Sequence, residues 1–405
     1  MTPTHTLPPF PNDIGEWWWE EAQSRWPDLS EDKLLNLLRQ EIVKQSDRFN
    51  KFRNFDCDAY GKRDLSILAY GNFYFSRTWS AMAFSMAEAL YLRGWVPPQK
   101  GPIRVLDLGS GTGASGLSCL QILRNAGIEN HIQLEAIDYS SKSLAFLKKL
   151  HASKFAHWSN TRISTKKLDL RFLTEEMDRR KYDLILLGFS INELISDDQK
   201  DDDEFYKKLL FSLPGFLKTN GFAVITEPAE KDTCHLLHQK CFELVNSHKE
   251  LHLHSPYFND AFCSLAKRKA KYFSHEVRKI LPFFLVEKIN RPLNLEIRKV
   301  KFGLSIIGLQ TPKKIGRARE VCRIISPIKK RKGTVSFIGM NHNGTEYKYE
   351  LQRRFLSKKE VDDLMHLNRG DILELKNIEI DEQSDRIRIE KYDDLLPLFT
   401  PRQKE

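Results

Sequence analysis

A glycine-rich loop, GSGTG, joins a short apolar segment to a segment with helical periodicity. The apolar run 103–108 predicts a buried β-strand, because it is β-branched and too short for a helix. From 114 to 126 the apolar residues recur at helical spacing. Strand, glycine loop and helix open a βαβ nucleotide-binding unit. Glycines let a backbone approach a ligand, and a helix start offers free N–H groups. The residues expected to contact that ligand are Gly109, Ser110, Gly111, Thr112 and Gly113.

The spacing of these glycines limits which nucleotide the loop can bind. The dinucleotide motif GxGxxG needs its third glycine where this chain has Ala114, and no Lys-Ser or Lys-Thr pair completes a P-loop. The carboxylate of Asp107, at the end of the strand, would repel a pyrophosphate but suits a ligand with an ammonium group. S-adenosylmethionine is such a ligand, and we expect it to be the cofactor. The alternative interpretation is a glycine turn that arose by chance.

Further segments predict the other strands of one sheet. They are His131–Asp138, Ile163–Asp169, Tyr182–Gly188, Leu217–Thr226 and Val300–Leu309. Strands that alternate with helical segments predict an α/β fold, a parallel sheet with helices on both faces and a ligand beyond the carboxyl ends of the strands. The glycine loop resembles the first motif of class I methyltransferases, which implies their Rossmann-like sheet.

Two acids follow strands of this sheet. Asp138 ends the second strand and can accept hydrogen bonds from both hydroxyls of a ribose, and Tyr139 and Ser140 come next to it. Asp169 follows the third strand. Its side chain would either contact the adenine amine of the cofactor or cap a helix that starts at Leu170.

Asn192 and Glu193 follow the fourth strand and are the candidate catalytic residues. Both are expected to face the pocket; the alternative role of Asn192 is a cap for the helix near Asp201. The motif Asn/Asp-Pro-Pro-Tyr of amino-methylating enzymes is missing at this place, and so is a Pro-Cys pair for methylation of cytosine C5. The acceptor atom therefore stays open.

A chain of 405 residues is long enough for two or three domains. We expect an N-terminal helical region at 1–95, whose proline-rich residues 1–12 are disordered. The methyltransferase domain is expected at 96–311, with an insertion at about 249–299. Residues 312–395 are expected to form a small β-barrel of OB type, a fold that often binds oligonucleotides. The five strands predicted for it are Val321–Ile325, Gly333–Ile338, Tyr347–Leu351, Ile372–Leu375 and Arg386–Glu390.

Positive charge is concentrated in one part of the chain. Between Ala261 and Val335 there are 20 Lys and Arg against 4 Asp and Glu, whereas the whole chain has a net charge of +10. Such local density is typical of surfaces that bind phosphate backbones, and the alternative is a solvated surface that aids solubility. The candidate RNA-binding residues are Lys267, Arg268, Lys269, Lys271, Lys329, Lys330, Arg331 and Lys332.

Composition favours a soluble protein in a reducing compartment. Mean hydropathy is −0.47, and no stretch of about 18 apolar residues could span a membrane. The N-terminal segment lacks a basic region followed by an apolar one, so no signal peptide is expected. The six cysteines are scattered without a CxxC pair, which fits reduced thiols in the cytoplasm.

Several short motifs resemble one family. In chain order they are Leu68–Tyr74, Phe189–Leu194, Glu227–Glu230, Cys263–Ala266 and Lys301–Ser305. Together they are similar to the methyltransferase-like assembly proteins of the small ribosomal subunit, known from mitochondria and bacteria. The resemblance covers roughly residues 60–390. It implies binding to the maturing subunit near its RNA, by a methyltransferase fold.

Members of that family carry cysteines that hold a metal or an iron–sulfur cluster, and this chain departs from the pattern. Tyr257 and Ser274 stand where the family has cysteines, which leaves Cys263 and Cys322. Two thiolates are too few for a Cys₄ cluster, so no metal is expected. The alternative is a zinc site assisted by His275.

These observations predict a methyltransferase that uses S-adenosylmethionine and acts on ribosomal RNA or in assembly of the small subunit. Two alternatives remain open. One is a non-catalytic assembly factor that binds RNA, and the other is a methyltransferase for a small molecule or a protein.

Overall fold

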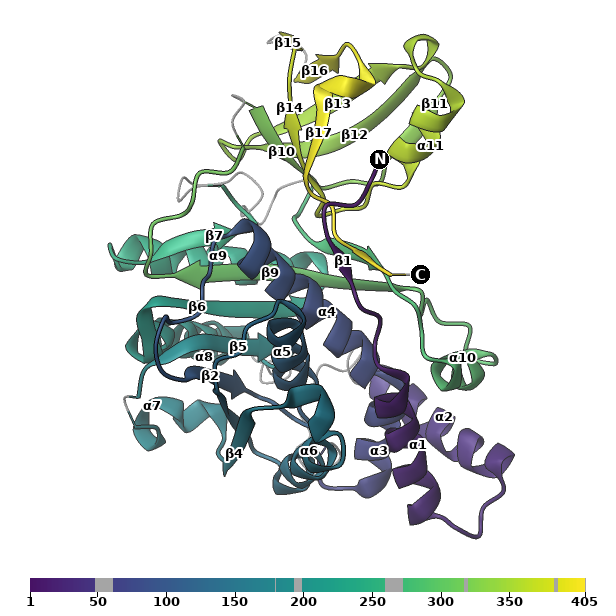
Figure 1. Ribbon diagram of the computed structural model, residues 1–405, viewed down its shortest axis with the longest axis vertical. Coiled ribbons are helices and arrows are strands. Elements are labelled where there is room, and N and C mark those ends of the chain that lie inside the picture. The colour runs from purple at the N-terminus through teal and green to yellow at the C-terminus, as the bar shows by residue number, and fades with distance from the viewer. Residues whose placement is uncertain are drawn as a thin grey trace.

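The computed structural model describes residues 1–47, 61–178, 180–192, 199–258, 272–316, 320–381 and 385–404. Figure 1 shows a large α/β body, a smaller β body above it, and a group of N-terminal helices beside the α/β body. Within the described ranges, no helix combines the length and the apolarity needed to span a membrane.

One sheet forms the centre of the α/β body. Its strands are β2 Ile103–Leu108, β3 Ile132–Asp138, β4 Thr161–Lys167, β5 Tyr182–Gly188, β6 Leu217–Pro228, β7 His252–Ser255, β8 Glu276–Lys279 and β9 Lys299–Gly308. Their order is β4-β3-β2-β5-β6-β9-β7, and β8 also pairs with β9. The first five strands in this order run parallel, whereas β9 is antiparallel to β6, β7 and β8. The predicted α/β fold is confirmed.

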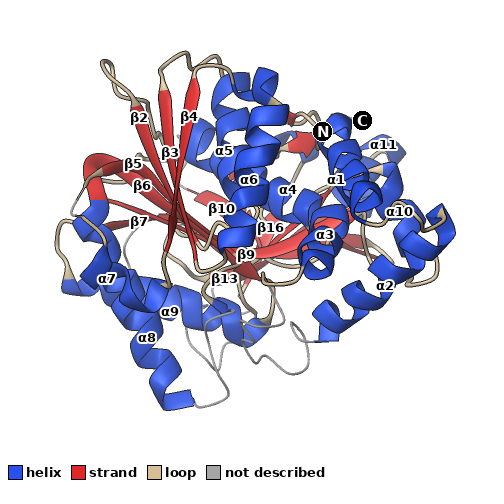
Figure 2. Cartoon of the chain, turned by 90° about the horizontal axis from the view of Figure 1, so that it is seen from below, coloured by secondary structure: helices blue, strands red, loops and turns tan. Residues whose placement is uncertain are grey.

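Helices cover both faces of this sheet (Figure 2). The helices are α5 Ala114–Asn125, α6 Ser141–Ser153, α7 Leu173–Glu176, α8 Gln199–Ser212 and α9 Lys231–Ser247. Alternate residues of β2 enter two different cores, because side chains of a strand point to opposite faces. Val105 packs in the core that contains Leu117 of α5, whereas Leu106 packs in the core that contains Leu237 of α9.

The N-terminal region is helical as predicted, but its first residues are not disordered. The helices are α1 Asn12–Arg25, α2 Glu31–Asp47, α3 Asp64–Phe73 and α4 Phe75–Ala87. Strand β1, Thr6–Leu7, pairs in parallel with the C-terminal strand β18, Arg402–Gln403. Leu7 and Phe10 are buried, and the Phe10 ring packs against Phe75 and Trp79 of α4. Burial of these two apolar side chains orders a segment whose prolines suggested disorder.

The β body contains all five strands predicted for it and three more. Its elements are β10 Glu320–Ile324, β11 Lys329–Arg331, β12 Thr334–Asn341, β13 Glu346–Gln352, α11 Lys358–Met365, β14 Ile372–Leu375, β15 Ile378–Asp381, β16 Arg386–Ile389 and β17 Leu395–Phe399. The strand order is β15-β16-β13-β12-β10-β14-β17, with β11 on β12. Among the described residues β15 and β17 do not pair, so the predicted closed barrel of OB type is not found.

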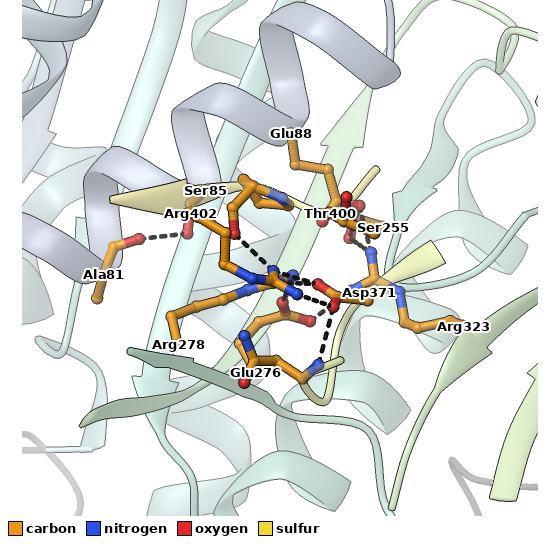
Figure 3. Close-up of polar contacts among 12 residues, drawn as sticks. Ala81, Ser85, Glu88, Ser255, Glu276, Arg278, Arg323, Asp371, Thr400 and Arg402 are labelled. Atoms are coloured by element: carbon orange, nitrogen blue, oxygen red, sulfur yellow. Dashed lines mark hydrogen bonds and ion pairs between the residues drawn. The ribbon is translucent and has the colours of Figure 1, made fainter. Parts of the chain in front are cut away.

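A buried network of arginines and carboxylates joins the β body to the α/β body (Figure 3). Arg323 of β10 donates to Glu88, in the π-helical turn Glu88–Leu92 after α4, and to Glu276 of β8. Arg278 of β8 donates to Glu276 and to Asp371, which precedes β14. These five side chains are at most 3% exposed. The centre of the network at the junction is therefore almost fully buried.

Two more arginines pair with acids of the network. Arg93 donates to Glu88 at 2.7 Å, and Arg402 donates to Asp371 at 2.6 Å. Burial alone would raise the pKa of Glu88, but the charges of Arg323 and Arg93 lower it to about 2. Glu88 is therefore ionised at neutral pH and holds both arginines in place.

Substitution of Glu88 by Gln should destabilise the chain by about 3–5 kcal/mol, because Arg93 and Arg323 would stay buried without their counter-ion. Urea unfolding measures the difference in the free energy of unfolding. Glu287→Gln is the matched control: its ion pair with Arg298 is exposed and should contribute less than about 1 kcal/mol. Equal losses in the two variants would contradict the stabilising role of the network.

Candidate functional site

A cavity of about 470 Å³ lies at the carboxyl ends of β2, β3, β5 and β6. This is the place where the strand order reverses, since the chain moves from β2 outward to β3 and β4 and then returns to β5 on the other side. Ligands of open α/β sheets bind at such a reversal. The walls include the glycine loop, the loops after β3, β4, β5 and β6, helices α3 and α4, and the segment before β9.

The glycine loop adopts a backbone that other residues rarely take. Gly109, Gly111 and Gly113 all have positive φ angles, of 69°, 51° and 91°. A Cβ on Gly109 would meet the Cβ of Ser190 at 2.4 Å, and one on Gly113 would meet a methyl of Leu147 at 2.2 Å. A Cβ on Gly111 would meet no other atom of the described residues within 4 Å. Gly109 and Gly113 are thus needed for packing, and Gly111 leaves the cavity free at the start of α5.

The predicted cofactor residues divide into two groups. Those that line the cavity are Gly109, Ser110, Gly111, Asp138, Tyr139 and Asp169. Those that lie behind the lining are Asp107, Thr112, Gly113 and Ser140. Ser140 caps α6, because its hydroxyl accepts a hydrogen bond from the Ser143 N–H at 3.1 Å. Thr112 is buried at 4% exposure.

Asp107 supports the loop from behind. Its Oδ2 accepts from the N–H of Gly116 in the first turn of α5 at 2.9 Å, while its buried Oδ1 has no hydrogen-bond partner among the described residues. Burial raises the pKa of Asp107 to about 7, against the effect of the Gly116 N–H. Asp107 is not among the residues that line the cavity, and its hydrogen bond positions the first turn of α5. The ammonium contact expected of it stays a prediction.

Asp138 is the acid that the cavity presents. Its Oδ2 accepts from the Gly111 N–H and its Oδ1 from the Ser140 N–H, both at 2.8 Å. Each carboxylate oxygen can accept a further hydrogen bond. Burial raises the pKa of Asp138 to about 6, although the two N–H groups oppose the shift. The carboxylate is therefore ionised at neutral pH and held in one orientation beside the glycine loop.

Of the two roles expected for Asp169, the structure shows the cap, and it also leaves the residue at the cavity. Its side chain accepts from the Arg171 N–H at 3.0 Å and so caps the 3₁₀ turn Leu170–Phe172. It also lines the cavity. Ion pairing with Arg171 lowers the pKa of Asp169 although burial opposes it.

Asn192 lines the cavity and Glu193 lies outside the described residues. The backbone N–H groups of Ile191 and Asn192 donate to the carboxylate of Glu227, at 3.0 and 3.2 Å. Glu227 is fully buried at the end of β6, and burial raises its pKa to about 8 despite these two bonds. Glu227 thus fixes the loop that carries Asn192, a role that sequence reasoning missed although the Glu-Pro-Ala-Glu motif had marked the residue.

One wall of the cavity was not predicted. Tyr70 of α3, Arg77 and Thr78 of α4, and Lys301 of β9 line it, together with Tyr74 between the two helices. The Tyr70 and Thr78 hydroxyls are 2.9 Å apart. The signals in the sequence were the motifs Leu68–Tyr74 and Lys301–Ser305, because helical periodicity does not tell which face of a helix meets a site.

The basic segment is only partly a surface. Lys267, Arg268, Lys269 and Lys271 lie outside the described residues. Lys329, Lys330, Arg331 and Lys332 are exposed on β11 and the turn after it. Arg278 and Arg323, by contrast, are buried in the ion network. Counting charges along the sequence therefore overestimated the positive surface.

The residues considered for a zinc site are His275, Cys322 and Cys263. Arg369 donates to Nε2 of His275 at 2.7 Å, and burial together with that cation lowers the pKa of His275 to about 3. Cys322 is buried in the core of the β body, and burial raises its pKa. Cys263 lies outside the described residues. Within them, no three His, Cys, Asp or Glu side chains form a metal site.

No family model and no curated protein matches this chain. Solved structures similar to it include phosphoethanolamine N-methyltransferase 1 of Haemonchus contortus with S-adenosylhomocysteine, at 15% identity over 48% of this chain and 33% of that chain, with a TM-score of 0.27. TrmN of Thermus thermophilus matches at 17% identity over 36% and 37%, with a TM-score of 0.26. A proposed rRNA methylase of Clostridium thermocellum matches at 13% identity over 52% and 89%, with a TM-score of 0.30.

The chain thus spans about a third of the length of the first two structures. The parallel sheet with antiparallel β9 is consistent with the fold of class I methyltransferases. Scores below 0.5 and identities below 25% leave activity, substrate and partners to be argued from the cavity.

Substitution of Asp107 by Asn should stabilise the chain at pH 8 but not at pH 4. The folded pKa of about 7 exceeds the unfolded value of about 3.9, so the folded state holds this proton more tightly and wild type loses stability as pH rises through that window. The gain at pH 8 should reach at most about 4 kcal/mol. Thermal unfolding across this pH range measures it, with exposed Asp28→Asn as control; the same gain at both pH values would contradict the raised pKa.

Proposed function

We propose that this chain is a cytoplasmic methyltransferase that uses S-adenosylmethionine and acts on ribosomal RNA or within the assembling small subunit. The observation that carries the proposal is the carboxylate of Asp138, which lines the cavity at the strand-order reversal and is held by the N–H of Gly111. An oriented acid next to a glycine loop and a helix start suits the ribose and the polar end of this cofactor.

The chain's own groups fit such a cofactor in three places. Asp138 would accept hydrogen bonds from the ribose hydroxyls, and Asp169 would accept one from the adenine amine. The open space at Gly111 leaves room for the methionine part, with Gly109 and Ser110 beside it. The cofactor would supply a methyl group on a sulfonium, whose transfer depends mostly on alignment with the acceptor.

The wall opposite the glycine loop would receive the acceptor. Asn192 and Glu230 approach from the sheet, and Tyr74 and Arg77 from the N-terminal helices. Glu227 would act as a positioning residue, because it holds the loop of Asn192 from behind. Aromatic rings and a cation in one wall suit a nucleotide, which has a flat base and a phosphate.

The basic surface supports RNA as the substrate class. Lys329, Lys330, Arg331 and Lys332 are exposed in the β body, which the buried ion network attaches to the α/β body. Membership in the assembly-protein family remains part of the proposal and rests on the short motifs alone.

Substitution of Asp138 by Ala should weaken the binding of S-adenosylhomocysteine by about 1.5–3 kcal/mol, because charge-assisted hydrogen bonds to the ribose are lost. Isothermal titration calorimetry measures the change. Asp178→Ala is the control, since this acid is exposed and does not line the cavity. Wild type that is folded but binds no S-adenosylhomocysteine would contradict the cofactor assignment.

S-adenosylmethionine with a tritiated methyl group tests the reaction itself. Incubation of the full chain with cell extract should place the label in RNA of the small subunit, and Asp138→Ala should reduce incorporation by about tenfold or more, in line with its binding loss. Label in protein or in small molecules alone would contradict the RNA assignment. Cofactor binding without any transfer would instead indicate a non-catalytic assembly factor.

A further inference from the structure

The register of the β body places basic side chains on one face of its sheet. Tyr349 of β13 and Ile387 of β16 pair with each other and are fully buried. Their neighbours along each strand point to the opposite face, because side chains alternate. That face, named here the basic face, carries Lys329, Arg331, Lys348, Arg386 and Arg388.

The basic face is not uniformly charged. Glu350 pairs with Arg388 across the strands and forms an ion pair with Lys348. Lys329, Arg331, Arg386 and Arg388 are nevertheless exposed. Glu379 and Asp381 of β15 pair in register with Arg388 and Arg386. The positive charge that remains lies mainly at Lys329 and Arg331, on the short strand β11.

An exposed aromatic ring lies at the end of this face. Phe355 ends the 3₁₀ turn Arg353–Phe355, which follows β13, and at 61% it is the most exposed large apolar side chain of the described residues. The N–H of Arg353 donates to the carbonyl of Gly333 at 2.8 Å, so this turn is adjacent to the turn that contains Lys332. The guanidinium of Arg354 lies over the Phe355 ring at 4.6 Å.

A phenylalanine ring this exposed adds little to the core. Core packing therefore does not explain why Phe355 is a phenylalanine. Exposed cations lie near it in the chain: Arg353 and Arg354 precede it, Lys358 and Lys359 follow it, and Lys332 is in the adjacent turn. An apolar protein partner would leave these cations desolvated without counter-ions. Single-stranded nucleic acid suits both the cations and the aromatic ring. Its phosphates pair with cations, and an unstacked base can stack on the ring. The bases of a duplex are already stacked and offer no such contact.

We propose that Phe355 and the basic face form a docking site for single-stranded RNA, with one base stacked on Phe355 and the phosphates over Lys329 and Arg331. The choice of RNA over DNA rests on the proposed function. The site itself belongs to the β body and needs neither the cofactor nor catalysis.

Fluorescence anisotropy of the full chain with a labelled single-stranded RNA of about 12 nucleotides tests the docking site. Phe355→Ala should weaken binding by about 5- to 100-fold, and Phe355→Trp should restore it. The dependence of affinity on salt should not change in Phe355→Ala, because no phosphate contact is lost. A variant with Gln at positions 329, 330, 331 and 332 should instead lower the salt slope by up to about 3.

Phe155→Ala is the matched control, because this ring is also exposed, at 46%, but lies in the α/β body. It should bind RNA as wild type does. Equal affinity of Phe355→Ala and wild type would overturn the proposal, and so would equal binding of a duplex of the same sequence. Titration with S-adenosylhomocysteine separates the two proposals: RNA binding that depends on Phe355 without cofactor binding would refute the enzyme and leave the docking site standing.

Discussion

The buried ion pairs of Arg323 connect the β body to the α/β body, which contains the cavity. Glu88 follows α4, the helix that brings Arg77 and Thr78 to the cavity. Glu276 begins β8, which pairs with β9 and so supports the strand that brings Lys301 to the cavity. One guanidinium in the β body thus contacts both the turn that follows α4 and the strand that pairs with β9 (Figure 3). The same ion pairs attach the β body to elements that continue into the cavity wall.

Two buried glutamates show how partners, and not burial, decide the charge of a site. Glu88 has two arginines and a pKa lowered to about 2. Glu227 accepts hydrogen bonds from two backbone N–H groups, and burial raises its pKa to about 8. The first is a permanent anion that holds cations, whereas the second is mostly protonated at neutral pH and still anchors the loop of Asn192. Desolvation acts on both, and only a nearby opposite charge outweighs it.

Local signals in the sequence predicted the centre of the site. The apolar run of β2, the glycines and the acid at the end of β3 each depend on neighbours within a few residues, so the loop and Asp138 could be predicted. Contacts between distant segments could not. The pairing of β1 with β18 and the entry of Arg77 into the cavity depend on packing, which a single sequence does not display. The strand order of the β body was not predicted for the same reason. Local sequence patterns indicate where strands lie, but they do not indicate whether the first and last strands pair to close a barrel.

Charge was the least reliable guide, because the sequence does not show burial. Arg278 and Arg323 contributed to the expected RNA surface and instead lie in the ion network. Phe355, by contrast, would be assigned to a core by its type, and the structure leaves it exposed.

Hydrogen exchange of the backbone amides, with and without S-adenosylhomocysteine, tests the central claim most directly. That claim is that the cavity beside Gly111 and Asp138 binds this cofactor. The ligand should slow exchange in the segments 109–115, 138–140 and 188–192, which surround the cavity, and leave the β-body strands β12 and β13 unchanged. Unaltered exchange in all three segments at saturating ligand, or protection confined to the β body, would contradict the account.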